Sequence, residues 1–390
     1  MIDKFIPYGR QEILQEDLEA VKAVLESDWL TQGPMIVQFE HAIAAYCQAQ
    51  HCVAFSSATA ALHLACLVLG VGKGDQVWTS PITFVASANC ALYCGASVNF
   101  VDICAETYNI SVPKLEEKLI WAKQHNCLPK VVIPVHFAGQ SCDMKAIKKL
   151  SDEYGFYIIE DASHAIGGQY LGKPVGSCDY SDMAVFSFHP VKIMTTGEGG
   201  AVTTNNPLWD KKLRLLRSHG ITRDSELMTI TPEGSWYYQQ IDLGFNYRIT
   251  DIQCALGIQQ LKRVDQYVAK RNLLVQSYEH KLSDLAIRLP RVSEGVYSAY
   301  HLYVVQLDYL NKISRAEVFK YMQDQNIGVN VHYIPVHTQP YYQSLGFKFG
   351  DYPLAEHYYA NAITLPLYPA LTEQEQDHVV ESLKQGLCQI

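Results

Sequence analysis

The chain contains 390 residues, of which 48% are apolar and 18% are charged, and its formal net charge is −9. This balance is typical of a globular protein and excludes disordered, collagen-like and low-complexity classes. At roughly 150 residues per domain, the length predicts two or three domains. The negative net charge disfavours nucleic-acid binding, which needs a basic surface, so no nucleic-acid partner is expected.

The N-terminal segment carries charged residues throughout and lacks the apolar core of a signal peptide. No stretch approaches about 18 consecutive apolar residues, so no membrane-spanning helix is expected. Many of the eleven cysteines lie in apolar strings, which favours buried, reduced thiols in a cytoplasmic protein. Cys90 and Cys94 lie four residues apart in a predicted helix, but no nearby His or Cys pair completes a metal site, so no metal is expected.

The first half of the chain alternates helical segments with short apolar runs. Residues 12–27 place apolar side chains on one stripe, which predicts an amphipathic helix. Seven strands are then predicted, at residues 52–56, 76–80, 98–102, 131–136, 156–161, 183–188 and 200–204. Helical segments rich in Ala and Cys separate the early strands, and loops precede the last two. Such apolar strands with helical crossovers predict an α/β fold whose mostly parallel sheet is covered on both faces.

The pattern changes after Asn246. One long helix is predicted over 250–282, followed by strands at 301–307 and 327–332 and by helices at 314–325 and 372–387. These elements predict a smaller α+β domain. The predicted organisation is therefore a large α/β domain over residues 1–250 and a small C-terminal α+β domain over residues 251–390, joined by the long helix.

Two charged residues follow strands in a way that points to a cofactor. Asp161 ends the apolar run 156–161, and Lys192 follows the run 183–188. Taken singly, Asp161 could cap a helix and Lys192 could be a solvated surface residue. Together, at the carboxyl ends of parallel strands, they suit pyridoxal phosphate, which needs a lysine for its aldehyde and a carboxylate for its ring nitrogen.

Hydroxyl groups near these residues could bind the cofactor's phosphate. Ser56, Ser57 and Thr59 lie at a strand-to-helix junction, where free N–H groups and the helix dipole attract an anion. In isolation this cluster could equally be a helix N-cap. Ser187, in the strand before Lys192, could add a hydroxyl. Phe84 follows another strand, where it could stack on the pyridine ring or lie in the core.

Six segments, in this order along the chain, resemble the DegT/DnrJ-type sugar aminotransferases: FSSATAALHLA, TSPITFVASAN, PVHFAGQ, IIEDASHAIGG, FSFHPVK with TTGEGGAV, and GFNYRITDIQCALG. The resemblance covers nearly the whole chain. It implies a fold type I pyridoxal-phosphate enzyme with a seven-stranded sheet. By motif, Lys192 is similar to the lysine that bonds to the cofactor, and Asp161 to the partner of the pyridinium nitrogen.

The same resemblance implies further contacts with the cofactor. His164 corresponds to the residue over the ring's 3′-oxygen, and Phe84 to the stacking aromatic. The implied phosphate ligands are Ala58, Thr59 and Ser187, joined by Asn246 from the other subunit of a homodimer with shared active sites.

A narrower resemblance, carried by DWLTQGP, SHGIT and VHYIPVHTQPYY, is to the pseudaminic-acid branch of the family. Its members aminate the 4-keto group of a UDP-linked 6-deoxy-N-acetyl sugar, and L-glutamate is the expected amino donor. From the residues alone, the last segment could be an interdomain loop. The substrate contacts implied by the resemblance are Tyr8, Trp29, Leu30, Thr31, Ser57, His332, Tyr333, Ile334 and Pro335.

Three other functions stay open. A sugar dehydratase of the same fold would have a histidine in place of Lys192, and a noncatalytic nucleotide-sugar sensor would not need the pair of Lys192 and Asp161. The third is an aminotransferase for a different nucleotide-linked 4-keto sugar, because the choice of sugar depends on details of the pocket rather than on the fold.

Overall fold

The computed structural model describes residues 4–307 and 314–389. Its centre is a seven-stranded sheet in the order β1-β9-β8-β5-β4-β2-β3. The strands are β1 (His51–Phe55), β2 (Gln76–Thr79), β3 (Ser97–Phe100), β4 (Val131–Ile133), β5 (Tyr157–Asp161), β8 (Met183–Ser187) and β9 (Gly200–Thr204). They match the seven strands predicted from the sequence, so the predicted fold class is confirmed.

The sheet brings several strand ends to one edge. β3, β2, β4, β5 and β8 run parallel, whereas β9 is antiparallel to both β8 and β1. The first residue of β9, Gly200, pairs with the last residue of β1, Phe55, and with the last residue of β8, Ser187. The carboxyl ends of β1, β5 and β8 therefore meet at the edge where ligands bind in parallel sheets.

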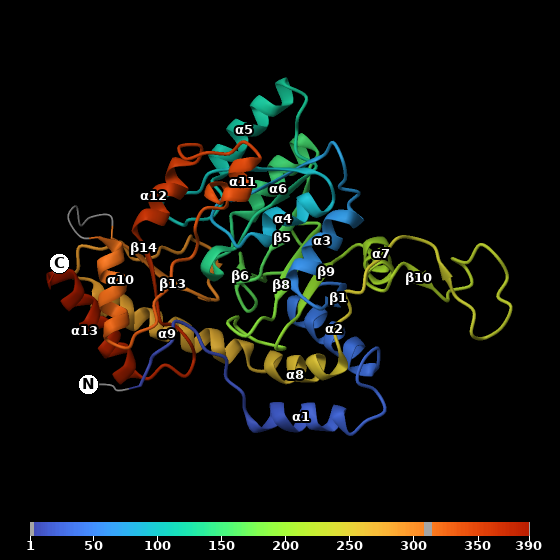
Figure 1. Ribbon diagram of the computed structural model, residues 1–390, viewed down its shortest axis with the longest axis horizontal. Coiled ribbons are helices and arrows are strands. Elements are labelled where there is room, and N and C mark those ends of the chain that lie inside the picture. The colour runs from blue at the N-terminus through green and yellow to red at the C-terminus, as the bar shows by residue number, and fades with distance from the viewer. Residues whose placement is uncertain (1–3, 308–313, 390) are drawn as a thin grey trace.

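Helices cover both faces of this sheet (Figure 1). On one face, apolar strand residues pack against α3 (Ala58–Val68), α4 (Ala86–Tyr93) and α7 (Pro207–Arg217). The opposite face packs against α2 (Pro34–Cys47), α5 (Val112–Gln124), α6 (Met144–Tyr154), α8 (Asp251–Leu261) and the start of α9 (Val264–Leu282). Each strand is thus buried on both sides, which is why its sequence is almost continuously apolar.

The prediction of one long helix over 250–282 is wrong, because α8 ends at Leu261 and α9 begins at Val264. At the break, the Arg263 amide donates to the Gln260 carbonyl in a tight turn. The Arg263 guanidinium binds the buried Asp17 carboxylate at 2.6 Å, which holds the turn in place. Neither Pro nor Gly marks this break, so the sequence pattern could not show it.

The C-terminal part has its own core. A two-stranded sheet of β13 (Tyr303–Gln306) and β14 (Ala362–Leu365) packs with α9, α10 (Arg315–Asp324) and α13 (Glu373–Gln389). The predicted strand at 327–332 is wrong, since only single bridges form there, Ile6 with Ile327 and Asn330 with Thr364. The remaining short elements are β6 (Gln169–Tyr170), β7 (Lys173–Pro174), β12 (Val296–Tyr297), α11 (Pro340–Ser344) and α12 (Pro353–Asn361).

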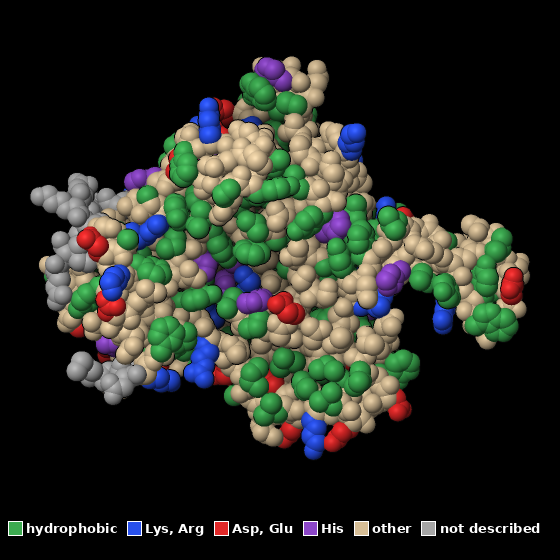
Figure 2. Space-filling model, viewed as in Figure 1, with side chains coloured by type: hydrophobic (Ala, Val, Ile, Leu, Met, Phe, Trp, Pro, Cys, Tyr) green, Lys and Arg blue, Asp and Glu red, His purple; other side chains and the backbone are tan. Residues whose placement is uncertain are grey.

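Two apolar surfaces lie outside these cores. The arm, residues 219–243, carries the short strands β10 (Ile221–Thr222) and β11 (Gln239–Gln240) and projects from the body in Figure 1. Trp236 and Leu243 on the arm are 70% and 77% exposed. The predicted N-terminal helix is α1 (Gln15–Leu25), but Leu18 and Leu25 of its apolar stripe are exposed, and hydrophobic side chains gather over this helix in Figure 2. No helix among the described residues is long and apolar enough to cross a membrane.

Candidate active site

A cavity of about 820 Å³ opens at the edge of the sheet where β1, β5 and β8 end. In Figure 2 histidine, basic and acidic side chains gather near the middle of the face shown. The cavity is lined by most of the site residues expected from the sequence: Tyr8, Ser57, Ala58, Thr59, Phe84, Asp161, His164, Ser187, Lys192, His332, Tyr333 and Ile334.

Lys192 lies in the turn after β8, where its amide donates to the His189 carbonyl at 2.9 Å. Burial lowers the pKa of the Lys192 amine to about 8, and the negative charge of Asp161 opposes this shift only in part. A substantial fraction of this amine is therefore neutral near pH 7–8, unlike that of a surface lysine. A neutral amine can attack an aldehyde and can accept a proton.

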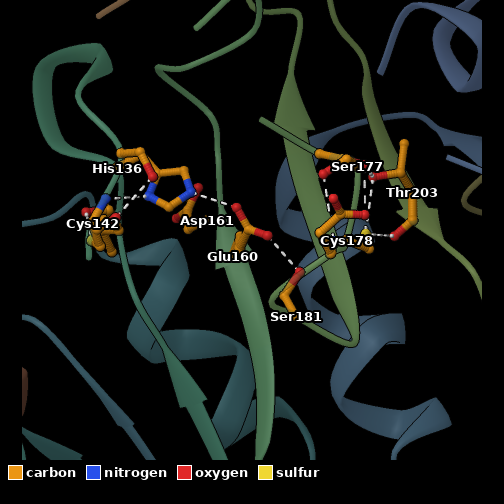
Figure 3. A network of polar contacts seen from close by, with 12 residues as sticks. His136, Cys142, Glu160, Asp161, Ser177, Cys178, Ser181 and Thr203 are labelled. Carbon is orange, nitrogen blue, oxygen red and sulfur yellow. Dashed lines mark hydrogen bonds and ion pairs between the residues drawn. The ribbon is translucent and has the colours of Figure 1, made fainter. Parts of the chain in front are cut away.

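Asp161 is the last residue of β5, and its side chain is held by two donors. The Ser87 hydroxyl donates to Oδ2 at 2.5 Å, and the Ser163 amide donates to Oδ1 at 3.1 Å. Each carboxylate oxygen has a second lone pair, so Asp161 can still accept a hydrogen bond from a group in the cavity. Its neighbour Glu160 is bonded elsewhere, to His136 and Ser181 (Figure 3).

The N-terminus of α3 forms the end of the cavity that suits an anion. Ser57 caps the helix by accepting from the Ala60 amide at 3.1 Å, and Thr59 and Ser187 line the same cavity. A Cβ atom on Gly200 would lie 2.5 Å from the Ala58 nitrogen, so only glycine lets the helix approach the strand edge this closely. Amide groups at a helix start, the helix dipole and adjacent hydroxyls are a phosphate-binding arrangement.

Three buried histidines, His164, His301 and His332, also line the cavity. The His164 Nε2 atom lies 3.0 Å from the Tyr333 hydroxyl, and the His164 and His301 ring centroids are 4.4 Å apart. Burial and the nearby Lys192 charge lower the pKa of His332 to about 3 and those of His164 and His301 well below their usual range. The three rings are therefore neutral at pH 7. Among the described residues, the buried Nδ1 atoms of His164 and His301 have no hydrogen-bond partner.

Phe84 is not a core residue, because it is 60% exposed at the cavity. Its ring centroid lies 6.5 Å from that of Tyr333, and both residues line the same cavity as Lys192. An exposed aromatic ring in the same cavity as Lys192 could stack on a planar ligand.

Five expected site residues do not line this cavity: Trp29, Leu30, Thr31, Pro335 and Asn246. Trp29 and Leu30 are exposed, and Thr31 forms a bridge with Thr250 just before α8. Asn246 forms a bridge with Ser218 near the base of the arm and is exposed. Pro335 is buried.

Sequence reasoning missed several polar residues that line the cavity, among them Thr83, Ser163 and His301, and it missed Ser87, which contacts Asp161 from behind. Thr83 and Ser87 lie four residues apart at the start of a predicted helix, a spacing that places both side chains on one face and could have drawn attention to them. His301 carried no such signal, because only the tertiary fold brings it beside His164. Among the described residues, no group of three or more His, Cys, Asp or Glu side chains could hold a metal ion.

The model of the DegT/DnrJ/EryC1/StrS aminotransferase family matches residues 11–384, so the chain belongs to this family. It is 36% identical to the UDP-4-amino-4,6-dideoxy-N-acetyl-beta-L-altrosamine transaminase of Campylobacter jejuni, over 98% of this chain and 100% of the relative. It is 37% identical to the GDP-perosamine synthase of Caulobacter vibrioides, over 93% of each chain. The PLP-form of a putative sugar aminotransferase, Spr1654 from Streptococcus pneumoniae, has a TM-score of 0.88 and 31% identity over 99% of each chain.

These findings confirm the family resemblance and the cofactor predicted from the sequence. The protein is a sugar aminotransferase that depends on pyridoxal phosphate and acts on an amino donor and a keto sugar. The cavity fits this cofactor, since one space holds a lysine with a lowered pKa, a carboxylate at a strand end and an anion-binding helix start.

Proposed function

We propose that this enzyme transfers the amino group of L-glutamate to the 4-keto carbon of a UDP-linked 6-deoxy-N-acetyl sugar, giving a UDP-4-amino sugar for pseudaminic acid biosynthesis. The observation that carries the aminotransfer is the shared cavity of Lys192, Asp161 and the start of α3. The choice of sugar is supported by the likeness to the Campylobacter jejuni transaminase over the whole of both chains and by His332, Tyr333 and Ile334 in the cavity wall.

Each residue has a distinct task in this proposal. Bound pyridoxal phosphate supplies an electron sink for the bond that breaks at the donor's α-carbon. Lys192 would hold the cofactor's aldehyde, and its neutral amine, once free, would take the proton from the α-carbon of glutamate. In the second half-reaction the same amine delivers a proton to C4 of the sugar. Asp161 would hold the proton on the ring nitrogen, and Phe84 would cover the ring.

The phosphate end and the ring's oxygen are assigned in the same way. The amide groups of Ala58 and Thr59 and the hydroxyls of Thr59 and Ser187, which line the cavity, would bind the phosphate, and the α3 dipole would add to their attraction. His164 would lie over the cofactor's 3′-oxygen. Because its pKa is lowered, His164 is neutral and can donate or accept one hydrogen bond there.

We also propose a homodimer in which each chain completes the site of the other. The exposed stripe of α1 and the apolar arm are surfaces that a second copy would bury. Trp29, Leu30, Thr31 and Asn246 lie outside their own cavity, as expected for residues that serve the neighbouring one. A two-fold axis makes such an exchange mutual.

The first experiment tests the role of Lys192. Borohydride reduction of the holoenzyme should lock the cofactor onto Lys192, and a peptide map should show that single modified lysine. Lys173 and Lys262 serve as internal controls, because Lys173 lies outside the cavity and Lys262 lies at the end of α8. Modification of either control in place of Lys192 would overturn the assignment, whereas Lys192→Ala should still bind cofactor but not turn over.

The second experiment tests the sugar. The enzyme, L-glutamate and a panel of UDP- and GDP-linked 4-keto sugars are incubated, and the products are identified by mass and NMR. We expect amination of the UDP-linked 6-deoxy-N-acetyl sugar. Turnover of a GDP-linked sugar alone would favour the alternative of a different nucleotide sugar, which the likeness to GDP-perosamine synthase supports. Binding without turnover of any sugar would indicate a sensor.

The third experiment tests the shared site. Asn246→Asp would place a negative charge against the partner's cofactor phosphate, while Lys192→Ala removes the base from its own chain. In a mixed dimer of these variants, one site carries both lesions and the other is intact. Because half of the dimers are mixed at random, roughly a quarter of full activity should return. If Asn246 serves its own chain, mixing restores nothing.

A further inference from the structure

Two buried hydroxyl groups are hydrogen-bonded in series to the Asp161 carboxylate. Ser87, in the first turn of α4, has its Oγ 2.5 Å from Asp161 Oδ2, and the Thr83 Oγ1 lies 2.7 Å from the same Ser87 oxygen. Ser87 and Thr83 are 0% and 2% exposed, and Asp161 is 5% exposed. The three side chains form a buried, linear series of hydrogen bonds from Thr83 through Ser87 to Asp161, which lines the cavity.

The direction of this chain follows from its end. An ionised carboxylate can only accept, so the Ser87 hydroxyl must donate to Asp161. The Ser87 oxygen is then an acceptor, and the Thr83 hydroxyl is the group that donates to it. Both O–H bonds therefore point toward Asp161. A donor to a charged acceptor contributes more than a neutral pair does, and burial strengthens it further.

Ser87 also fixes where the carboxylate lies. The other donor, the Ser163 amide, belongs to the same stretch of chain as Asp161, so it moves with β5. Ser87 belongs to α4, which packs on the sheet between other elements. The bond from Ser87 thus ties the rotamer of Asp161 to a second, rigid element. The same turn that holds Ser87 and Thr83 carries Phe84, so one segment sets both the carboxylate and the aromatic ring.

We propose that Ser87 is a positioning residue that holds Asp161 for the cofactor's ring nitrogen, and that Thr83 orients the Ser87 hydroxyl. The proposal rests on the role of Asp161 stated above. Without Ser87, the carboxylate gains a second rotamer and loses one of its two donors, so its lone pair no longer points permanently into the cavity. The reaction should then suffer in the steps that need the ring nitrogen, whereas sugar binding should not.

The test compares Ser87→Ala with Ser151→Ala. Ser151 is a matched control, because it is a buried serine on a helix, α6, and its hydroxyl donates one bond of 2.5 Å to the Phe156 carbonyl. In Ser87→Ala we expect kcat to fall about 10- to 100-fold, and the dissociation constant of pyridoxal phosphate from the apo-protein to rise about tenfold, since the bond lost is to a charged group. The KM for the sugar should change less than about threefold.

The visible spectrum of the bound cofactor gives a second readout that a loss of folding stability would not move. In Ser87→Ala its pH dependence should differ from that of the parent, because the partner of the ring nitrogen has moved. Ser151→Ala should keep the parent's spectrum, kcat and cofactor affinity. Equal behaviour of the two alanine variants in all three readouts would overturn the proposal.

A further pair keeps the test informative if Ser87→Ala does not fold. Thr83→Val removes the outer hydroxyl while leaving Ser87 in place, and Thr83→Ser retains that hydroxyl. We expect Thr83→Val to weaken cofactor binding and kcat about two- to fivefold and Thr83→Ser to match the parent, and no difference between them would contradict the role of Thr83. Asp161→Asn distinguishes a failure of the Ser87 proposal from a failure of the proposed function. If Asp161→Asn keeps full activity, the role assigned to Asp161 is wrong, whatever the Ser87 variant shows.

Discussion

Two neighbouring carboxylates on β5, Glu160 and Asp161, have different surroundings: Glu160 is hydrogen-bonded within the protein, and Asp161 lines the cavity. Each is 5% exposed, but successive side chains of a strand point to opposite faces of the sheet. Glu160 Oε2 lies 2.6 Å from His136 Nε2, and its Oε1 accepts from the Ser181 hydroxyl (Figure 3). The His136 Nδ1 accepts from the Cys142 amide, so in the neutral ring Nε2 carries the hydrogen and donates to Glu160.

The difference shows what makes a buried carboxylate available for chemistry. Both oxygens of Glu160 are hydrogen-bonded within the protein, and a void that Glu160 lines measures about 20 Å³, too small for a cofactor. Asp161 faces the cavity of about 820 Å³ and keeps a lone pair free for it. Glu160 therefore holds β4, β5 and the loop after β7 together, while Asp161 is free to bind a ligand.

The largest effect should come from Asp161→Asn. A neutral amide cannot hold the positive charge of a protonated ring nitrogen, so we expect kcat to fall on the order of 10²–10⁴-fold. The free energy of unfolding should change by about 1–2 kcal/mol, because the Ser163 amide can still donate to the amide oxygen and the Ser87 hydroxyl can turn to the Phe84 carbonyl and accept from the NH₂ group. Steady-state kinetics and urea unfolding of the apo-protein check both. Turnover close to that of the parent would mean that Asp161 is not the carboxylate that pairs with the ring nitrogen.

Glu160→Gln should show the reverse pattern. The carboxylate accepts from two donors, whereas an amide has one acceptor oxygen and a donor NH₂. The oxygen can accept from His136 only if the Ser181 hydroxyl turns to accept from the NH₂ group, and both partners lose a charged acceptor. We expect a loss of about 2–4 kcal/mol in the free energy of unfolding. The activity of the folded fraction should stay within about threefold of the parent. A 100-fold loss of kcat with unchanged stability would contradict this.

The sequence predicted the strand ends well but not what surrounds them. Apolar runs revealed all seven strands, and the position of Asp161 at the end of one run located the cavity edge. The sequence could not show which of Glu160 and Asp161 faces the cavity, since strand phase depends on register. The break at Arg263 depends on an ion pair with the distant Asp17. His301 depends on the approach of a C-terminal loop, so neither could be predicted from local pattern.

The last prediction concerns the loss of folding stability at acid pH, which should come from the histidines at the cavity and not from the other face of β5. On the far face of β5 His136 is hydrogen-bonded to Glu160, whereas the cavity is lined by His164, His301 and His332, whose pKa values are lowered. A histidine whose pKa is about 3 in the folded chain and about 6.5 in the unfolded chain binds more protons when unfolded at any pH between these values. Stability should therefore fall as the pH drops below about 6.5.

For His332 alone the loss should reach about 2 kcal/mol at pH 5, which is 1.5 pH steps of about 1.4 kcal/mol each, and His164 and His301 act in the same direction. Urea unfolding of the apo-protein at pH 7.5 and pH 5 measures this loss. In His332→Gln the difference between the two pH values should shrink by about 2 kcal/mol, whatever the variant's stability at pH 7.5. His41→Gln, on the exposed side of α2, is the control and should keep the parent's difference. If both variants show the parent's acid sensitivity, the cavity histidines do not cause it, and the contrast between the two faces of β5 is one of hydrogen bonding alone.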